Sequence, residues 1–246
     1  MSNKINKPSV ILFDLDDTIV SFDGVCRPAW VKICGDFTSK YNTDFSADEL
    51  LNAIDKVKDW YWKDPVRHKW GREHLLLARR DVVRYALKDL NITDEDMVCE
   101  IADGYTKLQD DMIHMLPGAY EALDILKNAG IRMAVITNGA SEVQRGKLER
   151  FGISHFFEKI YIDTEVGYSK PDIRLFQHVI KDMSINPEET WMVGDNLTWD
   201  IFGPRQVGIY AVWNDYDKEG LPDDIKEKPD LVVNSIFEMA RIIITD

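Results

Sequence analysis

The stretch Val10-Ile-Leu-Phe-Asp-Leu-Asp-Asp-Thr-Ile-Val20 begins as a buried strand and then presents three carboxylates, Asp14, Asp16 and Asp17. Four consecutive apolar residues, Val10–Phe13, are typical of a strand that is covered on both faces. Carboxylates at the end of such a strand cost folding free energy unless they are paired or hydrogen-bonded. We therefore expect carboxylates of this segment to have a functional role.

Further short apolar runs predict a sheet around this strand. They are Met133–Thr137, Lys159–Ile162, Trp191–Val193, Tyr210–Trp213 and Leu231–Val233. Between them lie stretches with helical periodicity, such as Ala119–Ala129 followed by Gly130, and Ile173–Met183 with its apolar stripe. Strands that alternate with helices predict an α/β fold with a doubly wound, Rossmann-like parallel sheet.

The region between the first and second strands is different, because it contains no convincing strand. Its helical patterns include Glu73–Leu90, whose apolar residues fall on one face. We therefore predict an α/β catalytic core made of residues 1–20 and 116–246, and a helical insert of residues 21–115.

Composition limits the class of protein. The formal net charge of −13 argues against binding to nucleic acid, which rewards clustered Lys and Arg. The longest apolar runs are too short to cross a membrane, and the first residues do not resemble a secretory signal. Three cysteines without CxxC spacing are typical of free thiols in a reducing compartment. We expect a cytoplasmic protein, either a monomer or a homodimer.

Polar clusters follow four of the predicted elements in order. They are Asp14-Leu-Asp16-Asp17-Thr18, Thr137-Asn138-Gly139, Lys170-Pro171 and Gly194-Asp195-Asn196-Leu-Thr198-Trp-Asp200. Each alone could be a turn or a helix cap. Because ligands of open α/β sheets bind outside the carboxyl ends of the strands, their joint occurrence there favours one shared site.

These four clusters resemble the motifs of the haloacid dehalogenase (HAD) superfamily of hydrolases. The insert after the first motif is similar to that family's C1 helical cap, and residues 170–196 resemble the segment that joins its third and fourth motifs. The resemblance implies that Asp14 is a nucleophile that forms an aspartyl-phosphate. It implies that Asp16 is the general acid and base, and that Lys170 offsets the charge of nucleophile and phosphate.

The resemblance also implies a Mg²⁺ site and a phosphoryl-binding site. The side chains of Asp14 and Asp195 and the backbone carbonyl of Asp16 would bind the metal, with Asp200 near it or acting through water. Thr137 and the backbone N–H of Asn138 would bind the phosphoryl group together with Lys170. Asp17 is expected to be a turn residue, and Thr18 to support the loop by hydrogen bonding.

The expected function is that of a Mg²⁺-dependent phosphatase acting on a small phosphorylated metabolite. Dehalogenases of the superfamily lack an acid at the position of Asp16, so its presence favours phosphoryl transfer. A phosphotransferase or mutase could use the same intermediate. Two alternatives of another class are a phospho-accepting receiver domain and a catalytically silent binding protein with this fold.

The insert carries a basic and aromatic segment, residues 56–84, with nine Lys or Arg residues against four Asp or Glu residues. One interpretation is that its tryptophans and cations contact an anionic substrate. The other is that the aromatic residues pack the insert while the basic residues are solvated. Both interpretations stay open at the level of the sequence.

Overall fold

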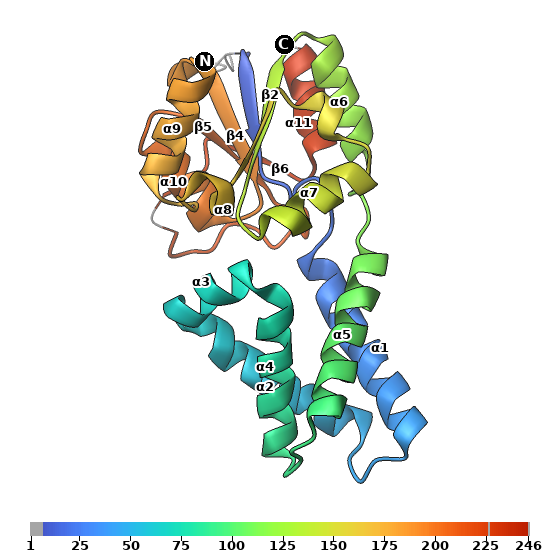
Figure 1. The fold of residues 1–246 in the computed structure, drawn as a ribbon. Coiled ribbons are helices and arrows are strands. Elements are labelled where there is room, and N and C mark those ends of the chain that lie inside the picture. Colours follow the sequence, from blue (N-terminus) through green and yellow to red (C-terminus); the bar gives the residue numbers. More distant parts are fainter. Residues whose placement is uncertain (1–6, 226, 246) are drawn as a thin grey trace. The chain divides into compact units, whose positions relative to one another are not determined.

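The computed structural model describes residues 7–225 and 227–245 (Figure 1). Its centre is a six-stranded parallel sheet in the order β3-β2-β1-β4-β5-β6. The predicted doubly wound α/β fold is confirmed. The strands are β1 (Val10–Phe13), β2 (Arg132–Thr137), β3 (Lys159–Ile162), β4 (Thr190–Gly194), β5 (Tyr210–Asn214) and β6 (Leu231–Val233).

Helices cover both faces of this sheet (Figure 1). On one side α6 packs against α11, and on the other α9 packs against α10. Every residue of β1 is buried, because the strand has neighbours on both edges and helices on both faces. The helices and shorter helical turns of this part are α6 (Ala119–Asn128), α7 (Ser141–Arg150), η1 (Ser154–Phe156), α8 (Asp163–Val166), α9 (Ile173–Met183), η2 (Pro187–Glu189), η3 (Leu197–Phe202), α10 (Gly203–Arg205) and α11 (Ile236–Thr245).

The chain divides into two compact units. The sheet unit comprises the residues up to Ser21 together with those from His114 onward, and the helical unit comprises Phe22–Ile113. The chain leaves and re-enters the sheet unit at neighbouring points. There the Ser21 N–H donates to the His114 carbonyl over 2.9 Å, and the Leu116 N–H donates to the Ile19 carbonyl over 2.9 Å. The catalytic and cap roles expected of these two parts stay predictions.

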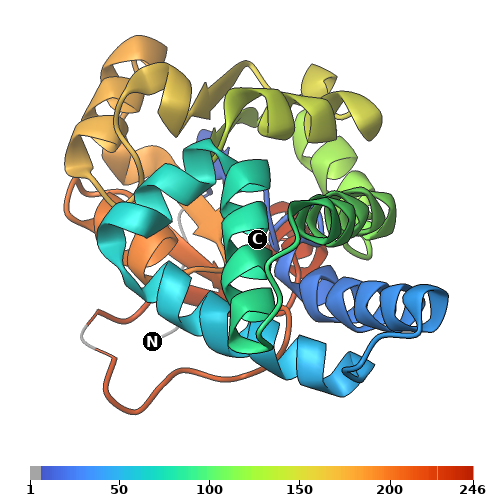
Figure 2. The same ribbon diagram turned by 60° about the horizontal axis from the view of Figure 1, so that its bottom comes forward.

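The helical unit is built from five helices around a core of its own. α1 lies alongside α5, and α4 packs against both α2 and α5 (Figures 1 and 2). The buried side chains of this core include Trp30, Ile54, Leu87 and Ile101. The helices are α1 (Asp23–Tyr41), α2 (Ala47–Lys63), α3 (Pro65–Glu73), α4 (Leu75–Asp89) and α5 (Glu95–Met112).

The expected helix over Glu73–Leu90 is shorter in the structure. α3 ends at Glu73 and α4 begins at Leu75. The residue between them, His74, has φ −129° and ψ 53°, which is not a helical backbone conformation. The apolar periodicity that suggested one continuous helix belongs to α4 alone. None of the helices among the described residues is long and apolar enough to cross a membrane.

Local sequence fixes where the helices of the insert begin. Ser46 and Glu49 form a capping box at the start of α2, since each side chain bonds the other residue's backbone N–H. Asp64 caps α3 directly before Pro65, which is favoured in a first helical turn. Asp94 accepts two backbone N–H groups at the start of α5. These caps satisfy donors that a helix start would otherwise leave unpaired.

We predict that Ser46→Ala lowers the free energy of unfolding by about 1 kcal/mol, because it removes an N-cap acceptor. Chemical denaturation followed by circular dichroism measures the loss. Ser39→Ala, at an exposed position near the end of α1, is the matched control and should cost little. Equal stabilities of the two variants would contradict the role given to the capping box.

Candidate active site

The register of the sheet brings three motif-bearing strand ends together. Phe13 of β1 lies opposite Val135 of β2 and Val193 of β4. The residues that follow these positions therefore meet at one edge of the sheet. This arrangement places Asp14, Thr137 and Asp195 near one another, as the sequence predicts.

Three carboxylates form the centre of this edge. Asp14, Asp195 and Asp200 each offer an oxygen within 4.8 Å of the others. Asp200 is fully buried and lies on the π-helical turn η3. Gly194 permits its approach, because a Cβ there would lie only 2.2 Å from the carboxyl carbon of Asp200.

Lys170 is buried among these acids. Its Nζ lies 2.7 Å from an oxygen of Asp14 and 2.7 Å from an oxygen of Asp200. A buried ammonium is tolerated only when it is paired and hydrogen-bonded, and here two carboxylates meet that need. The lysine is therefore held by the same acids whose charge it offsets.

Asn138 fixes the loop that carries Lys170. Its Nδ2 donates to the Lys170 carbonyl over 3.1 Å, and its Oδ1 accepts from the Lys170 N–H over 2.9 Å. The predicted contribution of Asn138 is its backbone N–H. The side chain adds a second function that the sequence analysis did not foresee, which is to hold the second motif to the third.

The nucleophile candidate, Asp14, is oriented from one side. Its Oδ1 accepts hydrogen bonds from the Leu15 N–H over 2.7 Å and from Lys170. Within the described residues, the hydrogen bonds that we find to this carboxylate all end on Oδ1. Oδ2 is therefore the oxygen left to meet an electrophile or a cation.

Burial and crowding shift the titration of the cluster. Burial raises the pKa of Asp14 to about 7, with Lys170 opposing the rise and Asp200 adding to it. Burial, together with repulsion from Asp14 and Asp200, raises the pKa of Asp195 to about 9. Burial alone would lower the pKa of Lys170, but the adjacent carboxylates outweigh it and keep that pKa above its usual value. The site thus carries more negative charge than one ammonium can balance.

The side chain of Asp16 lies outside this carboxylate cluster. Its Oδ1 is 2.6 Å from Nζ of Lys147, and its Oδ2 accepts from Nε2 of Gln144 over 3.0 Å. Both partners lie on α7 and both are buried. Sequence reasoning missed them, because the only large apolar residues of α7 are Val143 and Leu148, which do not form a stripe that shows which face is covered. The signal that was present is their spacing of three residues, directly after the second motif.

Thr137 belongs to the same network. Nε2 of Gln144 also donates to its Oγ1 over 2.6 Å, so the hydroxyl accepts from the protein and keeps its own proton for another acceptor. The following turn is held by Asp163, which accepts from the Gly139 N–H over 2.8 Å. The structure therefore presents Thr137 as a preset hydrogen-bond donor at the end of β2.

The remaining residues of the first motif have structural environments. Asp17 has φ 53°, and its N–H donates to the Val20 carbonyl over 2.6 Å, as expected of a turn residue. The expected hydrogen bond from Thr18 is not found, since its buried Oγ1 has no partner among the described residues. That prediction is wrong, and packing is the contribution that the structure shows for Thr18.

The basic and aromatic segment of the helical unit divides into two groups. Tyr61 is buried, and Trp62 packs against the backbone of Gly71, where a Cβ would lie 2.9 Å from its ring. Trp60 and Trp70 are exposed, with the guanidinium of Arg67 over the Trp60 ring at 3.8 Å. Packing explains the first pair, whereas the second pair keeps surface available to another molecule.

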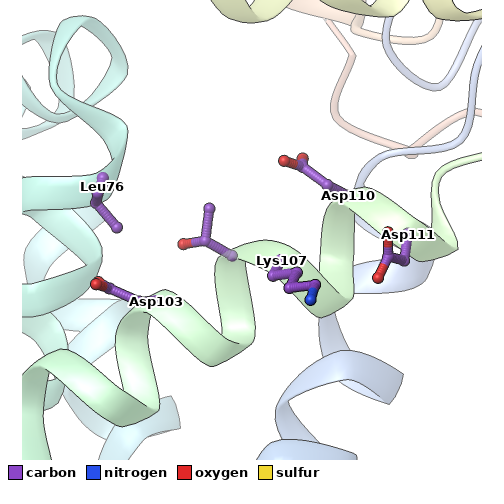
Figure 3. A pocket seen from close by; sticks show the side chains of 6 residues that line it. Leu76, Asp103, Lys107, Asp110 and Asp111 are labelled. Carbon is purple, nitrogen blue, oxygen red and sulfur yellow. The ribbon is translucent and has the colours of Figure 1, made fainter.

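The helical unit also contains a shallow hollow of about 370 Å³ (Figure 3). Its wall combines one apolar side chain with charges of both signs, and Asp103 is already paired with Arg80 over 2.6 Å. Lys107, Asp110 and Asp111 are exposed to solvent. We assign no function to this hollow.

Comparison with known proteins identifies the family. The model of haloacid dehalogenase-like hydrolases matches residues 8–208. The chain belongs to this family. A phosphoserine phosphatase from Thermus thermophilus is 36% identical over 94% of this chain and 97% of its own length. A glyceraldehyde 3-phosphate phosphatase from Methanothermobacter thermautotrophicus is 33% identical over 94% and 96% of the two chains.

A solved structure supports the same fold for this HAD-like hydrolase. The HAD-hydrolase YfnB from Bacillus subtilis, bound to magnesium, superimposes with a TM-score of 0.73 at 20% identity, covering 95% of this chain and 97% of its own. The predicted enzyme class, a HAD-like hydrolase related to phosphatases of phosphate monoesters, is confirmed. Family membership argues against the signalling receiver that the sequence alone left open.

The carboxylate cluster of this HAD-like hydrolase fits a divalent cation. Mg²⁺ prefers carboxylate and carbonyl oxygens, and it commonly binds through one or two carboxylates. Asp14, Asp195 and Asp200 supply such oxygens close together, and two of them have pKa values raised by burial and mutual repulsion. A bound cation would relieve that repulsion.

Without a metal, the contribution of Asp14 and Asp195 to stability should fall as the pH rises. Their raised pKa values, about 7 and about 9, mean that these two carboxylates bind more protons in the folded state than in the unfolded chain between roughly pH 4 and 9. In EDTA, Asp195→Asn should therefore be more stable than the wild type at pH 8, by at least about 1.4 kcal/mol, which is one pKa unit. The difference should shrink toward pH 4.

Urea denaturation across this pH range measures the effect. Asp111→Asn removes an exposed acid of the helical unit and is the control, which should follow the wild-type profile. A stability gain for Asp195→Asn that does not depend on pH would contradict the assignment.

Proposed function

We propose that this HAD-like hydrolase is a Mg²⁺-dependent phosphatase that cleaves a small phosphorylated metabolite through an aspartyl-phosphate on Asp14. One observation carries the proposal. Asp14 is a buried carboxylate that is held on one oxygen by Lys170 and the Leu15 N–H, and Asp195 and Asp200 adjoin it. Such a group is oriented for attack and can share a cation with its neighbours.

In the first half-reaction, an oxygen of Asp14 attacks phosphorus and the bond from phosphorus to the leaving oxygen breaks. Asp16, in its protonated form, delivers a proton to that oxygen, so that an alcohol departs. In the second half, water attacks phosphorus while Asp16 takes up its proton. The bond between Asp14 and phosphorus breaks, and inorganic phosphate leaves.

The remaining side chains bind and orient the phosphoryl group. The Thr137 hydroxyl and the Asn138 N–H would donate hydrogen bonds to its oxygens, and Lys170 would balance negative charge. Asp14, Asp195 and the Asp16 carbonyl would hold Mg²⁺, with Asp200 fixing Lys170 beside them. When bound, the cation would supply charge neutralisation for the phosphate and its attacking carboxylate.

The relatives suggest where to look for the substrate. Phosphoserine and glyceraldehyde 3-phosphate are both monoesters of a primary alcohol on a three-carbon skeleton. We propose that a small phosphate monoester of this kind is hydrolysed here. A panel of phosphorylated metabolites that also contains sugar phosphates, nucleotides and phosphoglycolate would identify it.

Asp14→Asn should abolish turnover of p-nitrophenyl phosphate, with a loss of at least about a thousandfold, because the amide cannot form the covalent intermediate. Its far-UV circular dichroism should match that of the wild type. Asp17→Asn is the control, because it alters a turn residue to which we assign no chemical role. It should keep activity within about threefold. Retained turnover in Asp14→Asn would refute the proposed nucleophile.

Removal of divalent cations should stop the reaction, since the site carries more negative charge than Lys170 can offset. We expect EDTA to abolish turnover and Mg²⁺ to restore it. Asp195→Asn should raise the Mg²⁺ concentration for half-maximal activity by about tenfold or more. Asp111→Asn serves again as the control, and an unchanged Mg²⁺ requirement in Asp195→Asn would count against the metal site.

A further inference from the structure

The structure surrounds the Asp16 carboxylate with two donors from a single helix. Lys147 contacts Oδ1 at 2.6 Å, and Gln144 contacts Oδ2 at 3.0 Å. Both donors lie on α7, one helical turn apart, so they face the same side. An aspartate with a separate donor on each oxygen is fixed both in position and in the plane of its carboxylate.

We propose that Gln144 and Lys147 are positioning residues that aim Asp16 at the oxygen of the leaving group. This inference rests on the proposed function, in which Asp16 transfers the proton. General acid catalysis requires the carboxyl group within hydrogen-bond reach of that oxygen, so a free rotation of Asp16 would reduce the fraction of productive complexes.

The burial of Lys147 supports a specific role. Its side chain is only 7% exposed, whereas that of Asp16 is 23% exposed. Exposed ion pairs contribute little, but an ammonium taken out of water needs a well-placed counter-charge. The covered lysine therefore anchors the pair, and the more accessible carboxylate is the partner that can meet a substrate.

Gln144 extends the arrangement to the phosphoryl-binding group. The same Nε2 that contacts Asp16 also lies 2.6 Å from Oγ1 of Thr137. One amide therefore sets the relative placement of the proton-transfer residue and of a hydroxyl proposed to bind phosphate. Hydrogen-bonded groups of this kind act as a unit in which single substitutions are not additive.

The leaving group provides a readout that a purely structural role would not affect. An alkoxide is a poor leaving group and needs the proton from Asp16, whereas p-nitrophenolate leaves without one. Lys147→Met should lower kcat/KM, which reports the first half-reaction, by about ten- to a hundredfold for the alkyl phosphate and by much less for p-nitrophenyl phosphate. The alkyl phosphate is the one turned over fastest among phosphoserine, glyceraldehyde 3-phosphate and UMP.

Two further variants complete the series. Lys147→Arg keeps a donor and a charge and should recover part of the lost kcat/KM for the alkyl phosphate. Arg145→Met is the matched control, because it removes a cation from the same helix whose carboxylate partner is Glu165, at 2.7 Å. It should keep kcat within about twofold on both substrates. Equal losses on the two substrates in Lys147→Met would overturn the proposal.

A double-mutant cycle with Asp16→Asn tests whether Lys147 acts through Asp16. If it does, adding Lys147→Met to Asp16→Asn should change kcat/KM for the alkyl phosphate by less than about twofold. Additive losses would overturn the inference and leave the proposed function intact, provided that Asp14→Asn is inactive. Activity in Asp14→Asn would instead reject the proposed function itself. Should Lys147→Met fail to fold, Lys147→Gln replaces it in the same cycle with the same two outcomes.

Discussion

The arrangement of the site depends on one buried ammonium shared by two carboxylates. Lys170 contacts both Asp14 and Asp200, so the position of each acid depends on the other. Removing Lys170 would leave both carboxylates without their counter-charge in a covered environment, which is far more costly than the loss of a surface ion pair. The surrounding backbone serves this triad. Gly194 leaves room for Asp200, and Asn138 holds the loop on which Lys170 lies.

The strands and helix α7 position the other residues of the site. Parallel strands in register deliver Asp14, Thr137 and Asp195 to one edge, and the rigidity of a sheet with both faces covered keeps them there. Helix α7 then approaches from the side and contacts Asp16 through Lys147. The two carboxylates of the first motif thus have different partners. Asp14 shares Lys170 with Asp200 and belongs to the acidic cluster that fits a cation, whereas Asp16 lies outside that cluster and contacts Lys147.

Much of this could be predicted from the sequence, because apolar runs and the polar residues that follow them are local signals. The strands, the helical insert and the grouping of Asp14, Thr137 and Lys170 all follow from such runs and from the rule that ligands bind at the carboxyl ends of strands. The contacts of Gln144 and Lys147 could not be predicted, since the two large apolar residues of α7 are too few to reveal which face is covered. The break at His74 could not be predicted either, because it precedes the first residue of the apolar stripe, where the periodicity carries no signal.

The point where the chain leaves the sheet unit has a consequence for how such proteins can vary. Ser21 and His114 lie side by side and exchange backbone and side-chain hydrogen bonds, so the ends of the helical unit begin and finish at adjacent positions. Closing a loop between neighbouring ends costs an entropy that grows only slowly with its length. A longer, shorter or wholly different insert could therefore occupy this place while the register of β1 stayed unchanged. The sheet edge with its carboxylates and the helical unit can therefore change independently, although they belong to one continuous polypeptide.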